Sequence, residues 1–188
     1  EGNETAVVSI SSVSGGSATE DGTQSVTITI TENESSPTIT LATSASSIAE
    51  NAGSSLTLTA TSSIVADEDI TVSISTSGTG TEGTDYSTIS DITISAGSTT
   101  GTASFTPTDD TTYEGNETGI VAISGVSGAD AAEDGTQSVT ITITEDDSAP
   151  TVTLATSASS IAENAGSSLT LTATLSIATT ADVTVALS

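Results

Sequence analysis

The chain has 188 residues, of which 25 are Asp or Glu and none is Lys, Arg, His or Cys, so its formal net charge is −25 at pH 7. These absences exclude the usual zinc ligands, His- or Cys-based nucleophilic catalysis and the phosphate-binding lysine of a P-loop. Since no basic side chain can neutralise phosphates, we expect no nucleic-acid partner. No apolar stretch approaches the length of a membrane-spanning helix, so we expect no insertion into a membrane.

Alternation of aliphatic and hydroxyl side chains predicts β-strands, because it separates an apolar face from a polar one. The clearest example is residues 55–61, Ser-Leu-Thr-Leu-Thr-Ala-Thr. In chain order, strands are expected at about 38–48, 55–61, 70–76, 88–95, 101–108, 117–124 and 138–145. Seven strands without helical periodicity favour an all-β fold, an antiparallel seven-stranded β-sandwich of immunoglobulin-like layout.

The sequence contains a tandem repeat whose period is 113. Residues 1–75 align with residues 114–188 without a gap, and 56 of the 75 pairs are identical. Because this period is the length of an ordinary domain, we interpret the chain as a window on tandem modules. Residues 1–37 are expected to be the C-terminal part of a preceding module, 38–150 a complete module, and 151–188 the N-terminal part of a following module.

The two incomplete parts do not add up to a module, because the counterpart of residues 76–113 is missing from them. Strand exchange between copies of this chain therefore cannot rebuild a whole module, and a longer continuous chain is the simpler interpretation. The strands of both parts would expose unpaired edges. Neighbouring modules of the same chain, or identical chains in a homopolymeric fibre, are the partners expected to cover them.

The acidic residues gather in the segments between strands. In an antiparallel sandwich these segments alternate between two ends, called here the first and the second pole. The second pole receives Asp67, Glu68, Asp69, Asp130, Glu133 and Asp134, and only Asp91 is expected on a strand. The first pole receives ten acids: Glu50, Glu82, Asp85, Asp109, Asp110, Glu114, Glu117, Glu145, Asp146 and Asp147. Acids often lie in loops merely because they are solvated there, but at this density they repel one another, and calcium relieves that repulsion with six to eight oxygen ligands.

Five separated segments resemble a Calx-beta domain: 48–53 (Ile-Ala-Glu-Asn-Ala-Gly), 80–86, 94–97, 109–117 and 142–147. That family is a seven-stranded β-sandwich that binds calcium at one pole, and it occurs in sodium/calcium exchangers, integrin β4 and large bacterial surface and matrix proteins. The resemblance implies Ca2+ as the cofactor. The ligands that it implies are Glu50, Asp85, Asp109, Asp110, Glu114, Glu145, Asp146, Asp147 and a backbone carbonyl near Thr112.

The partial modules keep only some of these positions. Asn33 stands where the complete module has Asp146, so we expect weaker binding in the preceding module. The following module keeps only Glu163 of the set. The affinity for calcium is therefore expected to differ along the chain.

The aromatic residues and paired acids do not indicate an enzyme. Tyr86, Phe105 and Tyr113 are the chain's aromatics, and we expect all three to fill the core rather than bind a ligand. Adjacent carboxylates such as Asp109 and Asp110 serve in glycoside hydrolysis, but three aromatics cannot line a sugar-binding cleft. We therefore expect no catalytic activity.

The predicted function is a calcium-binding structural repeat of a long extracellular fibre, surface adhesin or matrix protein, of bacterial origin, with calcium rigidifying the modules and their joints. Near-identity of successive modules favours a spacer, since a recognition site needs only one specialised copy. A glycan- or protein-binding adhesive module and a calcium-sensing regulatory module stay open as alternatives. Sequons at Asn3, Asn33 and Asn116 permit covalent glycans, although chance matches are expected at this Ser and Thr content.

Overall fold

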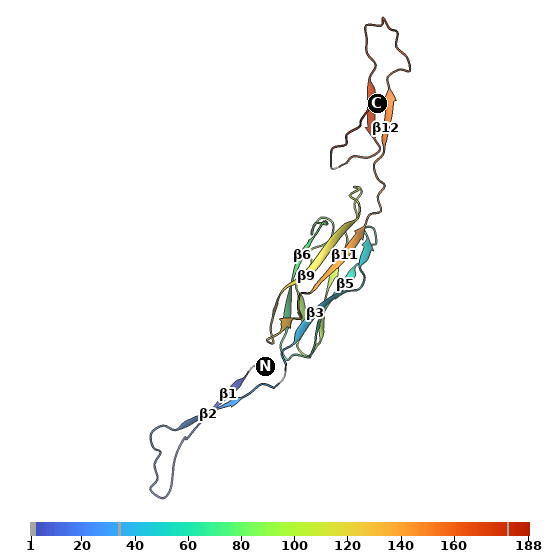
Figure 1. Ribbon diagram of the computed structural model, residues 1–188. Helices are drawn as coiled ribbons and strands as arrows, with labels where there is room; N and C mark the ends of the chain where they lie inside the picture. The colour runs from blue at the N-terminus through green and yellow to red at the C-terminus, as the bar shows by residue number, and fades with distance from the viewer. Residues whose placement is uncertain (1–2, 34, 180) are drawn as a thin grey trace.

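The structure is a computed structural model that describes residues 3–33, 35–179 and 181–188. Every helix or strand assigned within these ranges is a β-strand, which confirms the all-β prediction. A β-sandwich occupies the middle of the chain, and a β-hairpin extends from each of its two ends (Figure 1). No helix in the described ranges is long and apolar enough to cross a membrane.

The sandwich consists of two sheets. The first has the strand order β10 (Ala132–Glu133), β3 (Thr38–Thr43), β5 (Leu56–Ser62) and β8 (Thr100–Phe105). The second has the order β4 (Ser47–Ala49), β11 (Ser138–Thr144), β9 (Glu117–Ser127), β6 (Ile70–Gly78) and β7 (Ile92–Ile94). Neighbouring strands pair antiparallel, except that β10 is parallel to β3 and β4 is parallel to β11. This arrangement agrees with the immunoglobulin-like sandwich expected from the strand pattern.

The first expected strand, 38–48, is divided between the two sheets. β3 pairs with β5 in the first sheet, whereas β4 pairs with β11 in the second. The buried side chains of Ile39 and Leu41 lie at odd-numbered positions, whereas that of Ile48 lies at an even-numbered position. The alternation of buried and exposed residues therefore shifts by one where the chain crosses from the first sheet to the second. That shift is the local sign of the break, and treating 38–48 as one strand was wrong.

Asp91 is the second correction, because the strand expected at 88–95 is reduced to β7 and Asp91 precedes it. The Asp91 carboxylate accepts hydrogen bonds from Ser73 Oγ at 3.2 Å and from the Ile74 N–H at 2.9 Å. The pairing of β6 with β9 shifts register between these two residues. Asp91 therefore supports the backbone where the ladder is irregular.

The core lies between the sheets and is almost entirely aliphatic. Its buried residues are Ile39, Leu41, Ile48, Leu58, Ala60, Ile70, Val72, Tyr86, Ile89, Ile92, Ile94, Phe105, Val121, Ile123, Ile141 and Ile143. Tyr86 and Phe105 stack with ring centroids 4.7 Å apart. Tyr113 is 40% exposed in the loop before β9, so the prediction that it fills the core is wrong.

The terminal hairpins are β1 (Glu4–Ser9) with β2 (Ser25–Ile30), and β12 (Val152–Thr156) with β13 (Leu171–Leu175). All of their strand residues are exposed except Leu175, which is half-buried. In the alignment of the repeat, β1 and β2 correspond to parts of β9 and β11, and β12 and β13 correspond to parts of β3 and β5. Each hairpin therefore repeats a pair of sandwich strands.

Gly119 in β9 makes room for the aromatic pair. A Cβ at Gly119 would lie 2.7 Å from Phe105 Cε2 and 2.9 Å from its Cζ, closer than carbon atoms normally approach. We expect Gly119→Ala to lower the free energy of unfolding by about 1–3 kcal/mol, as overpacking of a core does. Urea denaturation would measure it. Gly125→Ala in the same strand is the control, since no atom outside its chain neighbours lies within 4 Å of the added Cβ. Equal losses in the two variants would contradict this role.

Candidate metal centre

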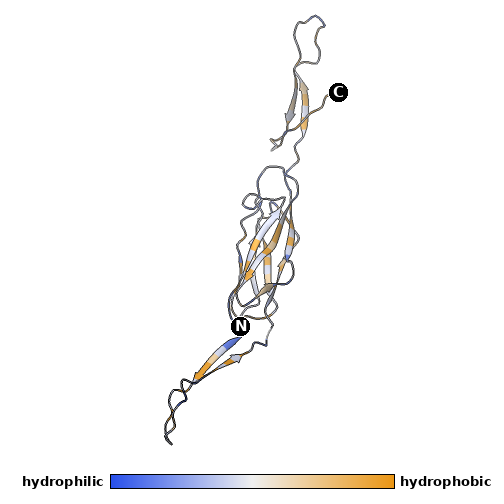
Figure 2. Ribbon diagram, turned by 60° about the vertical axis from the view of Figure 1, so that its left-hand side comes forward, coloured by the Kyte–Doolittle hydropathy of each residue, from blue (hydrophilic) through white to orange (hydrophobic). Residues whose placement is uncertain are grey.

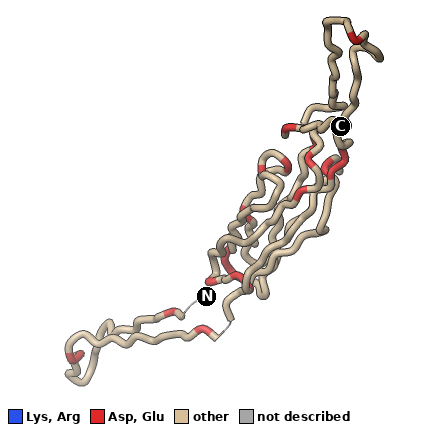
Figure 3. Tube along the Cα trace, turned by 45° about the horizontal axis from the view of Figure 1, so that its top comes forward, with Lys and Arg blue, Asp and Glu red and all other residues tan. Residues whose placement is uncertain are grey.

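The first pole is formed by the loops 50–55, 79–91 and 106–116 and by the segment 145–150 that follows β11. All ten acids expected at this pole lie in these segments or, for Glu117, at the adjoining start of β9. Figure 3 shows acidic residues gathered at the ends of the sandwich rather than along its strands. The alternation of loops between the two ends of an antiparallel fold therefore concentrates the negative charge.

The parallel pairing of β4 with β11 creates the first carboxylate group. Glu50 follows β4, while Glu145 and Asp146 follow β11, so the two strands deliver these acids to the same edge. The Glu50 N–H donates to the Thr144 carbonyl at 3.0 Å, which extends the parallel ladder up to the site. One carboxylate oxygen from each of Glu50, Glu145 and Asp146 lies within 4.8 Å of the other two.

Glu145 is the fixed member of this group. Its Oε2 accepts hydrogen bonds from the N–H groups of Glu114 at 2.7 Å and Gly115 at 2.8 Å. Its Oε1 accepts from the N–H groups of Asp147 at 2.8 Å and Asp146 at 3.1 Å. Burial opposes ionisation of Glu145, but these backbone donors outweigh it and hold its pKa below the usual value. Glu145 is therefore an anion that ties the 106–116 loop to the end of β11.

Glu50 has the opposite electrostatic character. Burial, followed by the neighbouring charges of Glu145 and Asp110, raises the pKa of Glu50 to about 7, although the Asp110 N–H partly opposes the shift. That N–H points to Glu50 Oε1 at 3.4 Å. Near neutral pH, a bound cation in place of the proton would remove this electrostatic cost.

A second carboxylate group joins Asp85, Glu114 and Glu117, again with one oxygen from each within 4.8 Å of the others. The Asp85 carboxylate caps its own loop by accepting the Thr81 N–H at 2.5 Å. Burial, then the charges of Asp85 and Glu114, raises the pKa of Glu117 to about 7. Glu117 was missing from the ligand set implied by the family resemblance. Its place among the ten acids of the first pole was the available signal.

Asp147 contains a polar atom that its surroundings do not satisfy. Among the described residues, its Oδ2 is the one buried side-chain oxygen or nitrogen without a hydrogen-bond partner. Burial, and then the charges of Asp146 and Glu145, raises the pKa of Asp147. A buried carboxylate oxygen without a donor is costly unless a cation or an ordered water satisfies it.

The other predicted ligands lie in the same loop but outside both groups. Asp109 and Asp110 are exposed, and Asp110 Oδ1 accepts the Thr112 N–H at 2.6 Å, which closes a turn of the 106–116 loop. The part of the Thr112 carbonyl in the site stays a prediction. The structure thus groups five of the nine predicted site residues into triads and adds Glu117 to them.

Several polar residues of the first pole serve as scaffold. Glu82 accepts hydrogen bonds from Thr76 Oγ1 at 2.6 Å and from the Ile89 N–H at 2.7 Å, so its carboxylate braces the 79–91 loop. Asn116 Oδ1 accepts the Glu145 N–H at 3.0 Å. Asn51 donates its side-chain amide to Asp146 at 2.5 Å. These contacts hold the carboxylates in place without supplying any positive charge.

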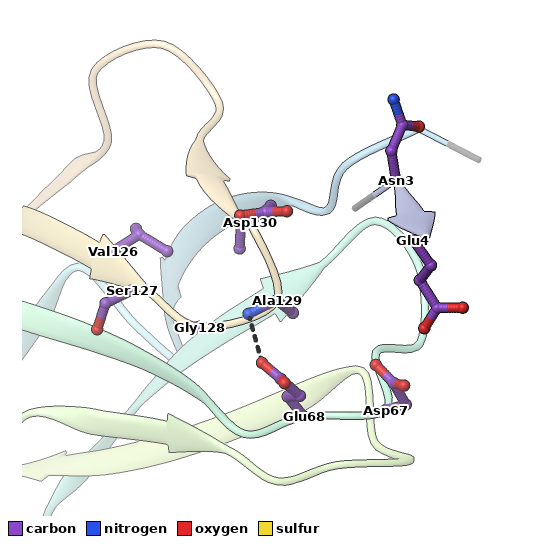
Figure 4. Close-up of a pocket in the computed structure, with 10 residues that line it drawn as sticks. Asn3, Glu4, Asp67, Glu68, Val126, Ser127, Gly128, Ala129 and Asp130 are labelled. Atoms are coloured by element: carbon purple, nitrogen blue, oxygen red, sulfur yellow. Dashed lines mark hydrogen bonds between the residues drawn. The ribbon is translucent and has the colours of Figure 1, made fainter. Parts of the chain in front are cut away.

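The second pole differs in how its acids are arranged. Asp67, Glu68 and Asp130 line an open cleft between the sandwich and Glu4 of the N-terminal hairpin (Figure 4). The Ala129 N–H donates to Glu68 on the sandwich side of this cleft at 3.4 Å. In the described ranges, only the first pole brings three carboxylates close enough to share an ion. The better-formed candidate metal centre is therefore at the first pole.

The donor set of the first pole fits a hard divalent cation. It offers oxygen atoms from separate loops, a buried oxygen of Asp147 that lacks a partner, and no nitrogen or sulfur ligand. Oxygen-rich, irregular sites of this kind suit calcium, whose coordination is flexible. Magnesium requires a tighter octahedron and retains more of its water.

No protein-family model matches the chain, and no curated protein sequence matches it. Among solved structures, the chain is similar to the crystal structure of CBD12 from CALX1.2, with a TM-score of 0.48 and 17% identity over 57% of this chain and 44% of that chain. It is also similar to the apo form of the Calx CBD1 domain, with a TM-score of 0.47 and 19% identity over 58% of this chain and 99% of that chain. The present chain thus spans less than half of the first structure. At 17 and 19% identity and TM-scores below 0.5, neither likeness assigns a function to this chain.

Glu50 and Glu117 make the stability of the metal-free protein depend on pH. Their folded-state pKa of about 7 lies above the ordinary 4.5, so the folded state holds these protons more tightly than the unfolded chain. The stability that they contribute is fully present below pH 4.5 and is lost as the pH rises through about 7. In chelator, we expect a higher melting temperature at low than at neutral pH, measured by circular dichroism. The double variant Glu50→Gln/Glu117→Gln should flatten this profile, and an unchanged slope would contradict the assignment.

Proposed function

We propose that the chain is a calcium-binding structural module of a long extracellular fibre, surface adhesin or matrix protein. The observation that carries this proposal is the pair of carboxylate triads at the first pole of a chain without Lys, Arg or His. Such a pole repels itself unless a cation from outside the protein balances it. Extracellular calcium has the charge, the preference for oxygen and the flexible coordination that this donor set needs.

The residues divide naturally between two ions. Glu50, Glu145 and Asp146 would hold one, and Asp85, Glu114 and Glu117 would hold the other. Asp147, Asp109 and Asp110 lie on the adjoining segments and extend the negative field around both. When bound, one ion would fasten the end of β4 to the end of β11, and the other would fasten the 79–91 loop to the 106–116 loop and the start of β9. The chemistry that calcium supplies here is structural, and we propose no catalytic step.

The repeat supports a role as one unit of a string. The 56 identities between residues 1–75 and 114–188 are those of interchangeable spacers rather than of a single specialised recognition site. Asp146 and Asp147 lie on the short segment that joins the sandwich to the β12–β13 hairpin, and Pro150 restricts the residue before it. In a string of modules, strand direction would set the acidic first pole of one beside the acidic second pole of the next. Calcium shared across that gap would stiffen the joint.

Calcium should raise the melting temperature of the protein, because a ligand of the folded state stabilises it by mass action. The gain is about 2.7 kcal/mol at a hundredfold excess over the dissociation constant. Differential scanning calorimetry in calcium, in magnesium and in chelator would measure it, with magnesium the weaker stabiliser. Glu50→Gln should remove much of the calcium effect, whereas Glu68→Gln at the second pole should keep it. The same melting temperature in calcium and in chelator would rule out the proposal.

The joint between modules should become rigid in calcium. We expect a protein of two complete modules to be an extended rod in calcium and a flexible string in chelator, as measured by small-angle X-ray scattering. Asp146→Asn/Asp147→Asn should loosen the rod while the sandwich stays folded. Glu145 is left unchanged because it accepts four backbone N–H groups and its loss would disturb the pole. Identical scattering in calcium and in chelator would limit the role of calcium to single modules.

A further inference from the structure

Strand β8 lies at the edge of the first sheet. The strand order β10–β3–β5–β8 means that, within the described ranges, β8 pairs with β5 and with no strand on its other side. An edge of this kind presents a row of backbone N–H and C=O groups on which another strand can pair. Proteins usually protect such edges by keeping them short or by placing a charge, a proline or a bulge on them.

The other edges of the two sheets are protected in this way. β10 has two residues and includes Glu133, and β4 has three residues and is followed by Glu50. β7 also has three residues, and Asp91 directly before it accepts the Ile74 N–H. Short length and nearby acids therefore discourage a further strand at these edges.

β8 lacks these protections. Its six residues, Thr-Gly-Thr-Ala-Ser-Phe, include no acid and no proline, and they pair with β5 in one continuous register. No acid stands between Asp91 and Asp109 in the sequence. Figure 2 shows pale, weakly polar residues between the hydrophobic ones along the strands of the sandwich. β8 is thus a neutral edge in a chain whose net charge is −25.

The register of the ladder identifies the free backbone groups of β8. The Ser62 N–H donates to the Thr99 carbonyl at 2.8 Å, so these residues form a hydrogen-bonded pair. Because hydrogen-bonded pairs alternate along an antiparallel ladder, the odd-numbered residues of β8 direct their backbone groups towards β5. The N–H and C=O groups of Thr100, Thr102 and Ser104 therefore point away from β5, and all three residues are exposed.

The chain just beyond β8 shows that this side accepts a second strand. The 79–91 loop runs beside it there, and the Ser87 N–H donates to the Thr106 carbonyl at 2.9 Å. The Thr108 N–H donates to the Asp85 carbonyl at 2.9 Å. Even-numbered residues use this side in both places, so the side that the loop occupies after β8 is the side that stays free along β8.

We propose that β8 pairs antiparallel with β8 of a second copy of this chain, so that the two first sheets become one continuous sheet. The pair is centred on a two-fold axis at Thr102, which opposes Thr102 of the second copy, while Thr100 opposes Ser104. In this register every free N–H and C=O group of the edge forms a hydrogen bond with the second copy. A shift in either direction leaves some of these groups unpaired.

A second copy is the partner because the edge is neutral and complementary to itself. A two-fold contact requires a surface that matches its own rotated copy, and an antiparallel pair of identical strands meets this requirement. The side chains of Thr100, Thr102 and Ser104 would face their counterparts on the outer side of the sheet, where cross-strand pairs of hydroxyl residues are favourable. The acids of both copies stay at the poles, which Figure 3 shows at the ends of the sandwich.

A single contact of this kind is weak. Two six-residue strands bury much less than the roughly 1,200–2,000 Å2 of a stable interface. The charge of −25 on each copy also opposes their approach. Salt should therefore strengthen the dimer, because the Debye length falls from about 10 Å at 0.1 M to about 3 Å at 1 M.

In a string of modules the same edge would recur on every module, and in this respect the inference rests on the proposed function. Many weak contacts between two strings act together once the first has formed. Because β8 pairs antiparallel with its copy, the two strings would lie side by side in opposite directions. The edge would thus join fibres laterally.

Disulfide crosslinking of the whole chain tests the pairing, since the sequence contains no cysteine. Opposed residues of a hydrogen-bonded pair have Cα atoms about 5.5 Å apart, which a disulfide can bridge. Thr102→Cys should therefore form a covalent dimer on mild oxidation. Thr57→Cys is the matched control, because Thr57 pairs with Ser104 on the same exposed face but lies one strand inside the edge. It should form far less dimer.

A mixture of two variants tests the register. Thr100→Cys and Ser104→Cys oppose each other in the proposed pair, so the mixed disulfide should form faster than either disulfide between identical variants. Faster crosslinking of identical variants would contradict the antiparallel register centred on Thr102.

Sedimentation equilibrium at high salt measures the dimer without a crosslink. Thr102→Asp should weaken it about fivefold or more, because like charges would lie directly opposite each other. Thr57→Asp adds the same charge one strand away and should leave the dimer nearly unchanged. Thr102→Pro removes the central free N–H and should also weaken the dimer, while its ladder with β5 is kept, since proline is tolerated where the N–H of an edge strand faces solvent.

Several results would overturn the pairing. They are equal crosslinking of Thr102→Cys and Thr57→Cys, dimers of Thr102→Asp and Thr102→Pro as strong as those of the unaltered chain, and a dimer that salt weakens. Dimers of a chain whose melting temperature does not respond to calcium would leave the pairing in place and remove the proposed calcium function. A monomer that calcium stabilises would do the reverse.

Discussion

The arrangement of the first pole depends on the parallel pairing of β4 with β11. These two strands end side by side, and each is followed at once by acidic residues, so the backbone ladder forces Glu50 towards Glu145 and Asp146. No side-chain attraction accounts for this proximity, since all three are acids. The proximity of these carboxylates is electrostatically unfavourable, and the raised pKa of Glu50 reflects this. A cation from outside the protein would remove the repulsion, and the proposed function follows from this need for a cation.

Glu145 shows how such a pole stays ordered despite its charge. Its carboxylate accepts four backbone N–H groups, from both the 106–116 loop and its own segment. Because these donors are dipoles rather than charges, they stabilise one anion without neutralising its neighbours. The loop is thus held in place while the remaining negative charge stays available to a cation. Backbone N–H groups thus fix the position of the loop, whereas the other carboxylates supply the negative charge that a cation would bind.

Much of the sandwich could be predicted from local pattern, whereas its long-range pairings could not. β11 alternates strictly between aliphatic and hydroxyl side chains, and β5 does so up to Thr61. Both strands were expected close to their observed bounds. The division of residues 38–48 between two sheets depends on the pairing of β3 with β5 and of β4 with β11. In the local sequence, only the one-residue shift in the alternation of buried positions indicates it. Glu117 was placed at the correct pole but left out of the ligand set, because its approach to Asp85 depends on how the 79–91 loop folds. Tyr113 was misassigned because exposure of a loop residue depends on packing that the local sequence does not specify.

The parallel pair of β4 and β11 has a mechanical consequence. β4 follows β3, which begins where the chain enters the sandwich, and β11 ends where the chain leaves it, so tension on the chain pulls β4 and β11 in opposite directions along their length. The hydrogen bonds between β4 and β11 would then be loaded in shear and would have to break together, instead of breaking one after another. A cation held between Glu50 and Glu145 would sit at the end of that same pair. A string of such sandwiches would resist extension at the place where its charges are concentrated.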